Sequence, residues 1–219
     1  MLPRVHAEIT RRALGALFST HALGSIVAAN LQLDAPWNQL GHDELHFDNN
    51  AFDRSDTYIA EQRALIRPAL EGRRPRRAWQ AFGRLTHTAQ DYYSHSNYVA
   101  LWLAGQGDGK APAPIEIDPL DAGIMESPAL HSGRPHMPFG VLSFVPGVGK
   151  WAERRLPPDS HARMNLDSAA RGPGFEYAFH AAVKRTLHEY GVLATSVSAA
   201  LMLQFRGFSA QAASLPQGD

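Results

Sequence analysis

The stretch GRLTHTAQDYYSHSNYV, Gly83–Val99, decides the fold, because it places three potential metal ligands at helical spacing. His87, Asp91 and His95 follow one another at intervals of four residues. Since an α-helix turns once every 3.6 residues, side chains at this spacing project from one face. Two imidazoles and a carboxylate, without a thiolate, suit a catalytic zinc ion that keeps one coordination position open.

The alternative is a solvated polar helix face, on which an Asp–His pair adds only about 0.3 kcal/mol to helix stability. The neighbours Tyr92, Tyr93, Tyr98 and Val99 are bulky, which indicates that part of this helix is buried. A buried aspartate flanked by two histidines without a metal would be costly. We therefore interpret the triad as part of a metal site.

Helical periodicity continues on both sides of this stretch, and no segment alternates as a strand would. We predict an all-α, multi-helix bundle that forms one domain over residues 1–219, with an irregular excursion at 105–158 and a flexible tail at 208–219. Helices are expected over Pro3–Asn30, Ser55–Leu70, Pro75–Leu103, Ser160–Ser168 and Glu176–Arg206, the first with a weak point at Gly24, the second with Ser55 as N-cap and the last interrupted at Gly191. Asp34–Asn50 is expected to be a loop, and Phe139–Trp151 is either a lipid-facing lid or a core-packing loop.

Composition limits the function classes. The 219 residues are 44% hydrophobic and carry 21 basic and 21 acidic residues, which argues against a nucleic-acid binder that works through a basic face. The chain has no cysteine, which excludes disulfides and thiolate metal sites, but it has 11 histidines. The start MLPRVHAEIT lacks an apolar signal-peptide core, so we expect export without a recognisable signal, or a cytoplasmic location. The apolar stretch Gly191–Phe205 is too short and too polar to span a bilayer.

Other parts of the chain offer partners for the triad. His46 and Asp48 lie in a polar loop before two helices, and the carboxylate of Asp34 can reach the same site. His6 precedes Ile9 on the first helix and so lies at its core-facing edge.

A second set of candidates follows the excursion. His161 and Asp167 are close enough to share a metal, and Asn165, four residues after His161, offers an amide oxygen. The competing pair is Glu176 and His180, which is either an alternative ligand pair, an outer contact or an exposed ion pair.

Four motifs in this order resemble the zinc-dependent phospholipase C superfamily, closest to the branch that includes bacterial phosphatidylcholine-hydrolysing enzymes and fungal HET-C proteins. They are VHAEITRRAL (Val5–Leu14), HFDN (His46–Asn49), HTAQDYYSHSNYV (His87–Val99) and HARMNLDS (His161–Ser168). The resemblance implies an all-α fold that holds two to three zinc ions, with Asp91 as the bridging carboxylate. It implies one zinc on His87, His46 and Asp34, another on His95, His161 and either Asp167 or Asn165, and a third on His6 and Asp91. We expect Asp34 and Asp91 to be catalytic residues, and Tyr93 and Asn97 to bind substrate.

The resemblance leads us to expect hydrolysis of a phosphodiester, most simply at a phospholipid headgroup, with transient contact to a membrane surface and no nucleic-acid partner. Zinc would lower the pKa of a bound water toward 7 and offset charge on the phosphate oxygens. One alternative is a zinc nuclease or phosphatase, in which aromatic side chains either stack bases or simply pack the core; these are Tyr92, Tyr93, Tyr98 and Trp37. The other is a HET-C-like membrane-active toxin or recognition protein in which zinc is structural.

Overall fold

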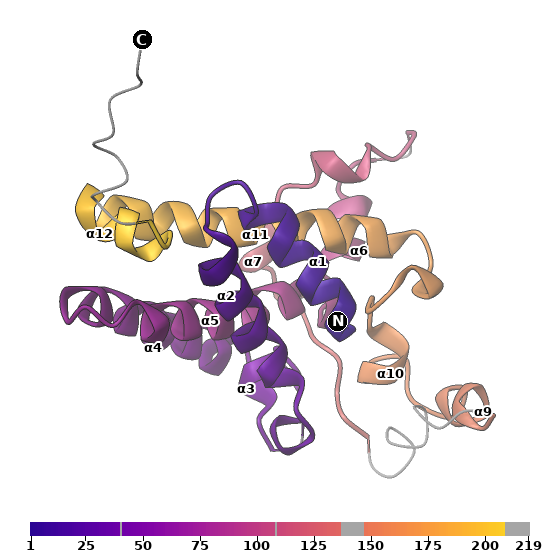
Figure 1. Cartoon of the computed structure of the whole chain (residues 1–219). Coiled ribbons are helices and arrows are strands. Elements are labelled where there is room, and N and C mark those ends of the chain that lie inside the picture. The colour runs from indigo at the N-terminus through magenta and orange to yellow at the C-terminus, as the bar shows by residue number, and fades with distance from the viewer. Residues whose placement is uncertain (40, 108, 137–146, 209–219) are drawn as a thin grey trace.

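The computed structural model describes residues 1–39, 41–107, 109–136 and 147–208, and the predicted all-α fold is confirmed over them (Figure 1). The only extended pairings among these residues are two isolated β-bridges, Ser96 with Ser132 and Arg134 with Ser160. The helices are α1 (Pro3–Leu14), α2 (Thr20–Leu31), α3 (Asp43–His46), α4 (Phe52–Glu71), α5 (Pro75–His95), α6 (Tyr98–Ala104), α7 (Ala122–Met125), α9 (Gly149–Glu153), α10 (His161–Met164), α11 (Gly174–Ser196) and α12 (Ala199–Phe205). Short 3-10 turns are η1 (Gln32–Asp34), η2 (Pro36–Asn38), η3 (Pro114–Glu116) and η4 (Ala169–Arg171).

Helix α5 is the centre of the bundle and packs against α2, α4 and α11. Every residue from Leu85 to His95 is buried, so this half of α5 has no solvent-facing side. The approach to α2 is close, because a Cβ added at Gly83 would lie 2.8 Å from the Ala29 Cβ. The polar side chains of this half therefore have to find their partners inside the protein.

Several helix boundaries differ from the sequence-based prediction. The helix expected over Pro3–Asn30 is broken after Leu14, and Ser19 begins the second part by accepting a hydrogen bond from the Ala22 N–H at 3.3 Å. The helix does not weaken at Gly24, which lies inside α2 with open space around it. The break is thus set by a serine cap, which the sequence analysis overlooked.

The other two long helices also differ. Helix α4 starts before Ser55, which is buried within it and is not its N-cap. Helix α11 runs through Gly191 and ends at Ser196, and Ser198 then caps α12. A glycine in open space weakens a helix by at most about 1 kcal/mol, which tertiary packing overrides here.

The irregular excursion contributes a short strap, Ser132–Arg134, that ends α5 and gathers the site. The Gly133 N–H donates to the His95 carbonyl at 2.8 Å, and the Asn97 N–H donates to the His131 carbonyl at 3.0 Å. These bonds replace helical ones, so α5 ends at His95 and not at the predicted Leu103.

The same strap holds two other segments. The Asn49 N–H donates to the Gly133 carbonyl at 2.8 Å, and the His161 N–H donates to the Arg134 carbonyl at 3.0 Å. A Cβ at Gly133 would lie 2.6 Å from the His161 Cα, so only glycine fits at this position. The strap thereby brings the segments that carry Asp48, His95 and His161 to one place.

Two predictions fall largely outside the described residues. These are most of the Phe139–Trp151 segment and the tail after Phe208. Nothing tests the prediction of a single domain, which stays a prediction. No helix in the described part of the chain has the length and apolar character needed to cross a membrane.

Candidate metal centre

Asp91 is the centre of a buried cluster of histidines and carboxylates. Its side chain is fully buried, and its two oxygens face different partners. Oδ2 lies 3.0 Å from His46 Nδ1 and 3.1 Å from His87 Nε2. Oδ1 lies 3.1 Å from His6 Nε2 and 3.6 Å from His95 Nε2, and it also accepts a short hydrogen bond from the amino group of Met1. This is the arrangement of a bridging carboxylate.

The first group of candidate ligands forms on the Oδ2 side. His46 Nδ1 and His87 Nε2 lie 3.2 Å apart, each close to Asp91 Oδ2, and Asp34 Oδ1 lies 3.9 Å from His87 Nε2. Ligand atoms around tetrahedral zinc are about 3.3 Å apart, given bond lengths near 2.0–2.1 Å. The spacing of these atoms therefore matches that of a metal-binding set, as predicted for His46, His87 and Asp91.

A second group forms around the strap. Asp48 Oδ1 lies 2.7 Å from His161 Nδ1 and 3.4 Å from His95 Nδ1. His95 Nδ1 also lies 2.8 Å from the His46 carbonyl, to which it donates, and this leaves His95 Nε2 facing Asp167 Oδ1 at 3.3 Å. A ring nitrogen fixed on a backbone carbonyl orients the other nitrogen toward a metal.

His6 is oriented by a buried hydrogen-bond network around Gln90. Gln90 Nε2 donates to Thr10 Oγ1 and Thr186 Oγ1, both at 3.1 Å, and the Thr186 hydroxyl donates onward to the Ala182 carbonyl. Because the Thr186 proton is used in this way, the orientation of the Gln90 amide is fixed.

The Gln90 oxygen must then accept the Nδ1–H of His6, whose distance to it is 2.7 Å. Neutral His6 consequently turns an unprotonated Nε2 toward Asp91 Oδ1, so two lone pairs meet at 3.1 Å. A cation between them would remove this repulsion.

Atoms without partners support the same interpretation. His6 Nε2, which faces Asp91 Oδ1, and Asp34 Oδ2 are buried and make no hydrogen bond in the structure. The same is true of His46 Nε2 and His87 Nδ1, the ring nitrogens opposite those that face Asp91. Buried polar atoms normally have partners, and nitrogen and oxygen donors of this kind are those that zinc accepts. His6, Asp34 and His87 also form a group in which one potential ligand atom of each residue lies within 4.8 Å of the other two. The donor set fits a metal centre with more than one ion.

Electrostatics in the cluster follow from burial and crowding. Burial raises the pKa of Asp34. Burial also lowers the pKa of His87 to about 3, helped by the neighbouring His6. Burial alone would raise the pKa of Asp91. The Met1 amino group and the surrounding imidazoles outweigh this effect and hold the pKa well below its usual range. Burial alone would lower the pKa of His95. The carboxylates of Asp91 and Asp48 outweigh this effect and raise the pKa well above its usual value.

Several predicted site residues are placed elsewhere or used otherwise. Asn165 donates its amide N–H groups to the carbonyls of His161 and Ala162, so it supports the α10 turn. Glu176 is exposed and His180 is half-buried on α11, where Arg12 lowers the pKa of His180 after the larger effect of burial. Neither residue joins the described ligand groups.

The two predicted substrate-binding residues have structural partners. Tyr93 is fully buried, and its hydroxyl donates to the Pro119 carbonyl at 2.6 Å. Asn97 holds the loop before the strap, because its amide donates to the Ala129 carbonyl and its oxygen accepts the His131 N–H. The polar atoms of both side chains are thus engaged within the protein, and their substrate role stays a prediction.

The structure also gives weight to residues that the sequence left uncertain or did not indicate. Asp48, a weaker ligand candidate from the sequence, contacts both His95 and His161. Gln90 and Gly133 were not considered. The only sequence signal for Gln90 is its position within the buried half of a helix, where a polar side chain needs partners.

The fold and the cluster together define an all-α protein with a candidate polynuclear metal centre. A sequence model of the family described as VWA7 N-terminal domain matches residues 5–107, which carry His6, Asp34, His46, Asp48 and the triad on α5 but not His161 or Asp167. No curated protein matches the chain significantly. No solved structure does so either. The predicted resemblance to the zinc-dependent phospholipase C superfamily is therefore wrong, because the matching family is a different one.

Proposed function

We propose that this chain is a zinc-dependent phosphodiester hydrolase, with a phospholipid headgroup as the substrate class to test first. The proposal rests on the chemistry of the cluster and not on membership of a known enzyme family. The observation that supports it is the position of Asp91, whose two oxygens face separate sets of ligand atoms. A carboxylate shared between metal ions is suited to clamping a phosphate during displacement.

Two ligand sets are available. His46, His87 and Asp34 would hold one ion with Asp91, and His95 and His161 would hold another with Asp48 or Asp167. His6 completes the Oδ1 side of Asp91. Bound zinc would bring the pKa of a water molecule near 7 and bind phosphate oxygens.

Asp34 is the best placed proton acceptor. Its side chain is 16% exposed, it retains an unpaired oxygen, and burial raises its pKa toward the range in which a general base works. Asp91 is fully enclosed with a lowered pKa, so its role is to hold the site and not to move protons. Of the two carboxylates predicted to be catalytic, the geometry favours Asp34 for proton transfer.

Substrate access is supported by the partial exposure of the outer ligands. Asp48, His161 and Asp167 are 15–18% exposed at their side chains, whereas Asp91 is not exposed. A surface hollow of about 230 Å³ includes Leu33 and Leu45, the chain neighbours of Asp34 and His46, together with the exposed Trp37. This hollow is a candidate location for the part of the substrate beyond the phosphate.

The test is a paired assay of the purified chain on phosphatidylcholine and on single-stranded DNA, each with zinc and with a chelator. We expect chelator-sensitive release of phosphocholine and inert DNA. Asp34→Asn should lower turnover more than zinc content, and the exposed Asp53→Asn is its matched control. Cleavage of DNA with inert lipid would overturn the choice of substrate, and activity that survives chelation would overturn the zinc mechanism.

A further inference from the structure

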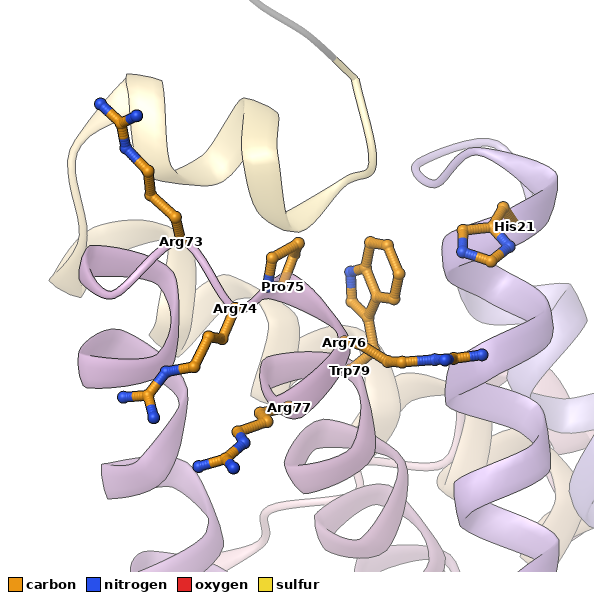
Figure 2. Close-up of a pocket in the computed structure, with 7 residues that line it drawn as sticks. All are labelled: His21, Arg73, Arg74, Pro75, Arg76, Arg77 and Trp79. Carbon is orange, nitrogen blue, oxygen red and sulfur yellow. The ribbon is translucent and has the colours of Figure 1, made fainter.

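The end of α5 opposite the metal centre carries a cluster of arginines that the proposed chemistry does not use. Arg73, Arg74, Arg76 and Arg77 follow one another around the short turn between α4 and α5, and all four are exposed. With His21, Pro75 and Trp79 they line a surface hollow of about 550 Å³ (Figure 2). We call this surface the arginine end.

The arginine end lacks the carboxylates that usually balance arginines. The three chain segments that build it, residues 9–33, 72–90 and 190–208, contain no aspartate or glutamate. Glu71, directly before the turn, is paired with Arg67 at 2.8 Å. In the described part of the chain, none of the four guanidinium groups has an ion-pair partner. A chain with zero net charge thus concentrates unbalanced positive charge at one end.

The turn that carries the arginines is held firmly. The Arg73 N–H donates to the Leu70 carbonyl at 2.9 Å and the Arg74 N–H donates to the Ala69 carbonyl at 2.8 Å, with Arg73 in the left-handed region at φ 54°. The Trp79 indole N–H donates to the Phe205 carbonyl at 2.6 Å, which ties α5 to α12. Like charges held near one another on a fixed backbone favour an anionic partner over solvent.

An exposed aromatic residue adjoins the arginines. Phe208 follows α12 and is 42% exposed, with the Arg206 guanidinium 5.4 Å from its ring centroid. The preceding Gly207 lies against Ser19 and Ala22 at the start of α2, next to His21. A guanidinium group beside an exposed aromatic ring, as with Arg206 and Phe208, is a pair of side-chain types that occupies the interface of an anionic bilayer.

We propose that the arginine end binds the phosphate groups of an anionic phospholipid bilayer, with Phe208 entering the interfacial region. The site is separate from the metal centre, because Arg77 and Asp91 are fourteen residues apart on one helix, or about 21 Å. The proposal concerns binding to a bilayer and not hydrolysis of a substrate, so its test is independent of the proposed hydrolase activity.

The test is sedimentation of the purified chain with vesicles of phosphatidylcholine alone and with vesicles that also contain phosphatidylglycerol. We expect binding only to the anionic vesicles, weakening as salt rises. Arg76→Gln/Arg77→Gln should weaken this binding about thirtyfold. The matched control Arg54→Gln/Arg67→Gln removes two exposed arginines that have carboxylate partners and should bind as the wild type does.

A second variant addresses the aromatic contact, since Phe208→Ser should reduce binding to anionic vesicles while the arginines remain. Equal binding to both vesicle types would overturn the proposal, as would full binding by the Arg76/Arg77 variant. Tighter binding of a single-stranded oligonucleotide than of anionic vesicles would also overturn it, by assigning the arginine end to nucleic acid.

Discussion

The two ends of α5 place charge in opposite ways. At the end near Pro75 the charged side chains are exposed, all of one sign and without ion-pair partners among the described residues. At the end near His95 they are buried, of both signs and within 4 Å of one another. Exposed arginines cost little free energy because water solvates them, whereas a buried carboxylate must be compensated. The difference teaches that only the buried end constrains its own chemistry, because its carboxylates must be balanced there, by the Met1 amino group and the imidazoles or by bound metal ions.

The largest effect is expected from Asp91→Asn. Replacing one carboxylate oxygen by an amide nitrogen removes a ligand atom from one side of the cluster and the negative charge from both, so zinc content and turnover should fall together, turnover by about three orders of magnitude. Elemental analysis and the phosphatidylcholine assay measure this. Asp53→Asn, an exposed aspartate on α4, should change neither. If Asp91→Asn retains its zinc, Asp91 is not a required ligand, and the contrast drawn between the two ends of α5 fails.

Gln90→Met should be next in effect. The apolar side chain leaves the His6 Nδ1–H and the Asn30 amide without their acceptor, so unfolding should become easier by about 2–3 kcal/mol. Because His6 loses its fixed orientation, zinc affinity should fall about 10–100-fold. Gln62→Met, the same change on α4, is the control for a buried glutamine outside the cluster. If both variants lose zinc equally, Gln90 has no orienting role.

Gly133→Ala should affect the second ligand group more than the first. The added Cβ meets the His161 backbone and moves it away from Asp48, so one class of zinc sites should weaken about tenfold while the other is unchanged. Zinc titration followed by calorimetry resolves the two classes. Gly191→Ala, where the added Cβ meets nothing, should leave zinc binding intact and raise stability by up to about 1 kcal/mol. An equal loss at both classes would contradict the role of the strap.

Zinc binding should release protons. The raised pKa of His95 keeps this imidazole protonated in the metal-free protein near neutral pH, and a ligand must lose its proton to bind zinc. The affinity should therefore rise with pH up to the pKa of His95 and level off above it. Calorimetry in buffers of different ionisation enthalpy counts the released protons. A count of zero for the wild type would show that His95 is not a ligand.

The smallest effect on the folded state should come from the arginine end. Arg76→Gln/Arg77→Gln removes exposed charges without ion-pair partners, so the free energy of unfolding should change by no more than about 0.5 kcal/mol and zinc content should not change. Thermal unfolding and elemental analysis check both quantities. A large loss of stability would mean that these arginines are structural, and the contrast between the two ends would then be lost.

The sequence predicted the fold class and the core of the cluster because both depend on short-range periodicity. The spacing of His87, Asp91 and His95 is a local property of one helix, and all three residues do lie on α5 with Asp91 close to both histidines. The break at Ser96 was not predicted, because bonds to a strap some 35 residues later end the helix. Asp48 was underweighted for the same reason, since its contact with His161 spans 113 positions.

Family likeness was the weaker guide. The motif order led to a phospholipase C superfamily assignment that the matching family contradicts, although His87 does lie in one ligand group with His46 and in another with Asp34. Tyr93 and Asn97, which we predict to bind substrate, donate hydrogen bonds to backbone carbonyls, and their substrate role stays a prediction. The helical spacing of the ligand residues correctly predicted that they share one helix, whereas the resemblance predicted the wrong family.

The central claim is that Asp91 bridges metal ions, and zinc stoichiometry tests it most directly. Elemental analysis of the purified chain after zinc loading and removal of free metal should find at least two zinc ions per chain, one in the ligand set that includes Asp91 and one in the set of Asp48, His95 and His161, whose His95 Nε2 lies 3.6 Å from Asp91 Oδ1. The Asp91→Asn variant, prepared in parallel, should retain less than one. No zinc in the wild type, or the same content in both proteins, would contradict the account.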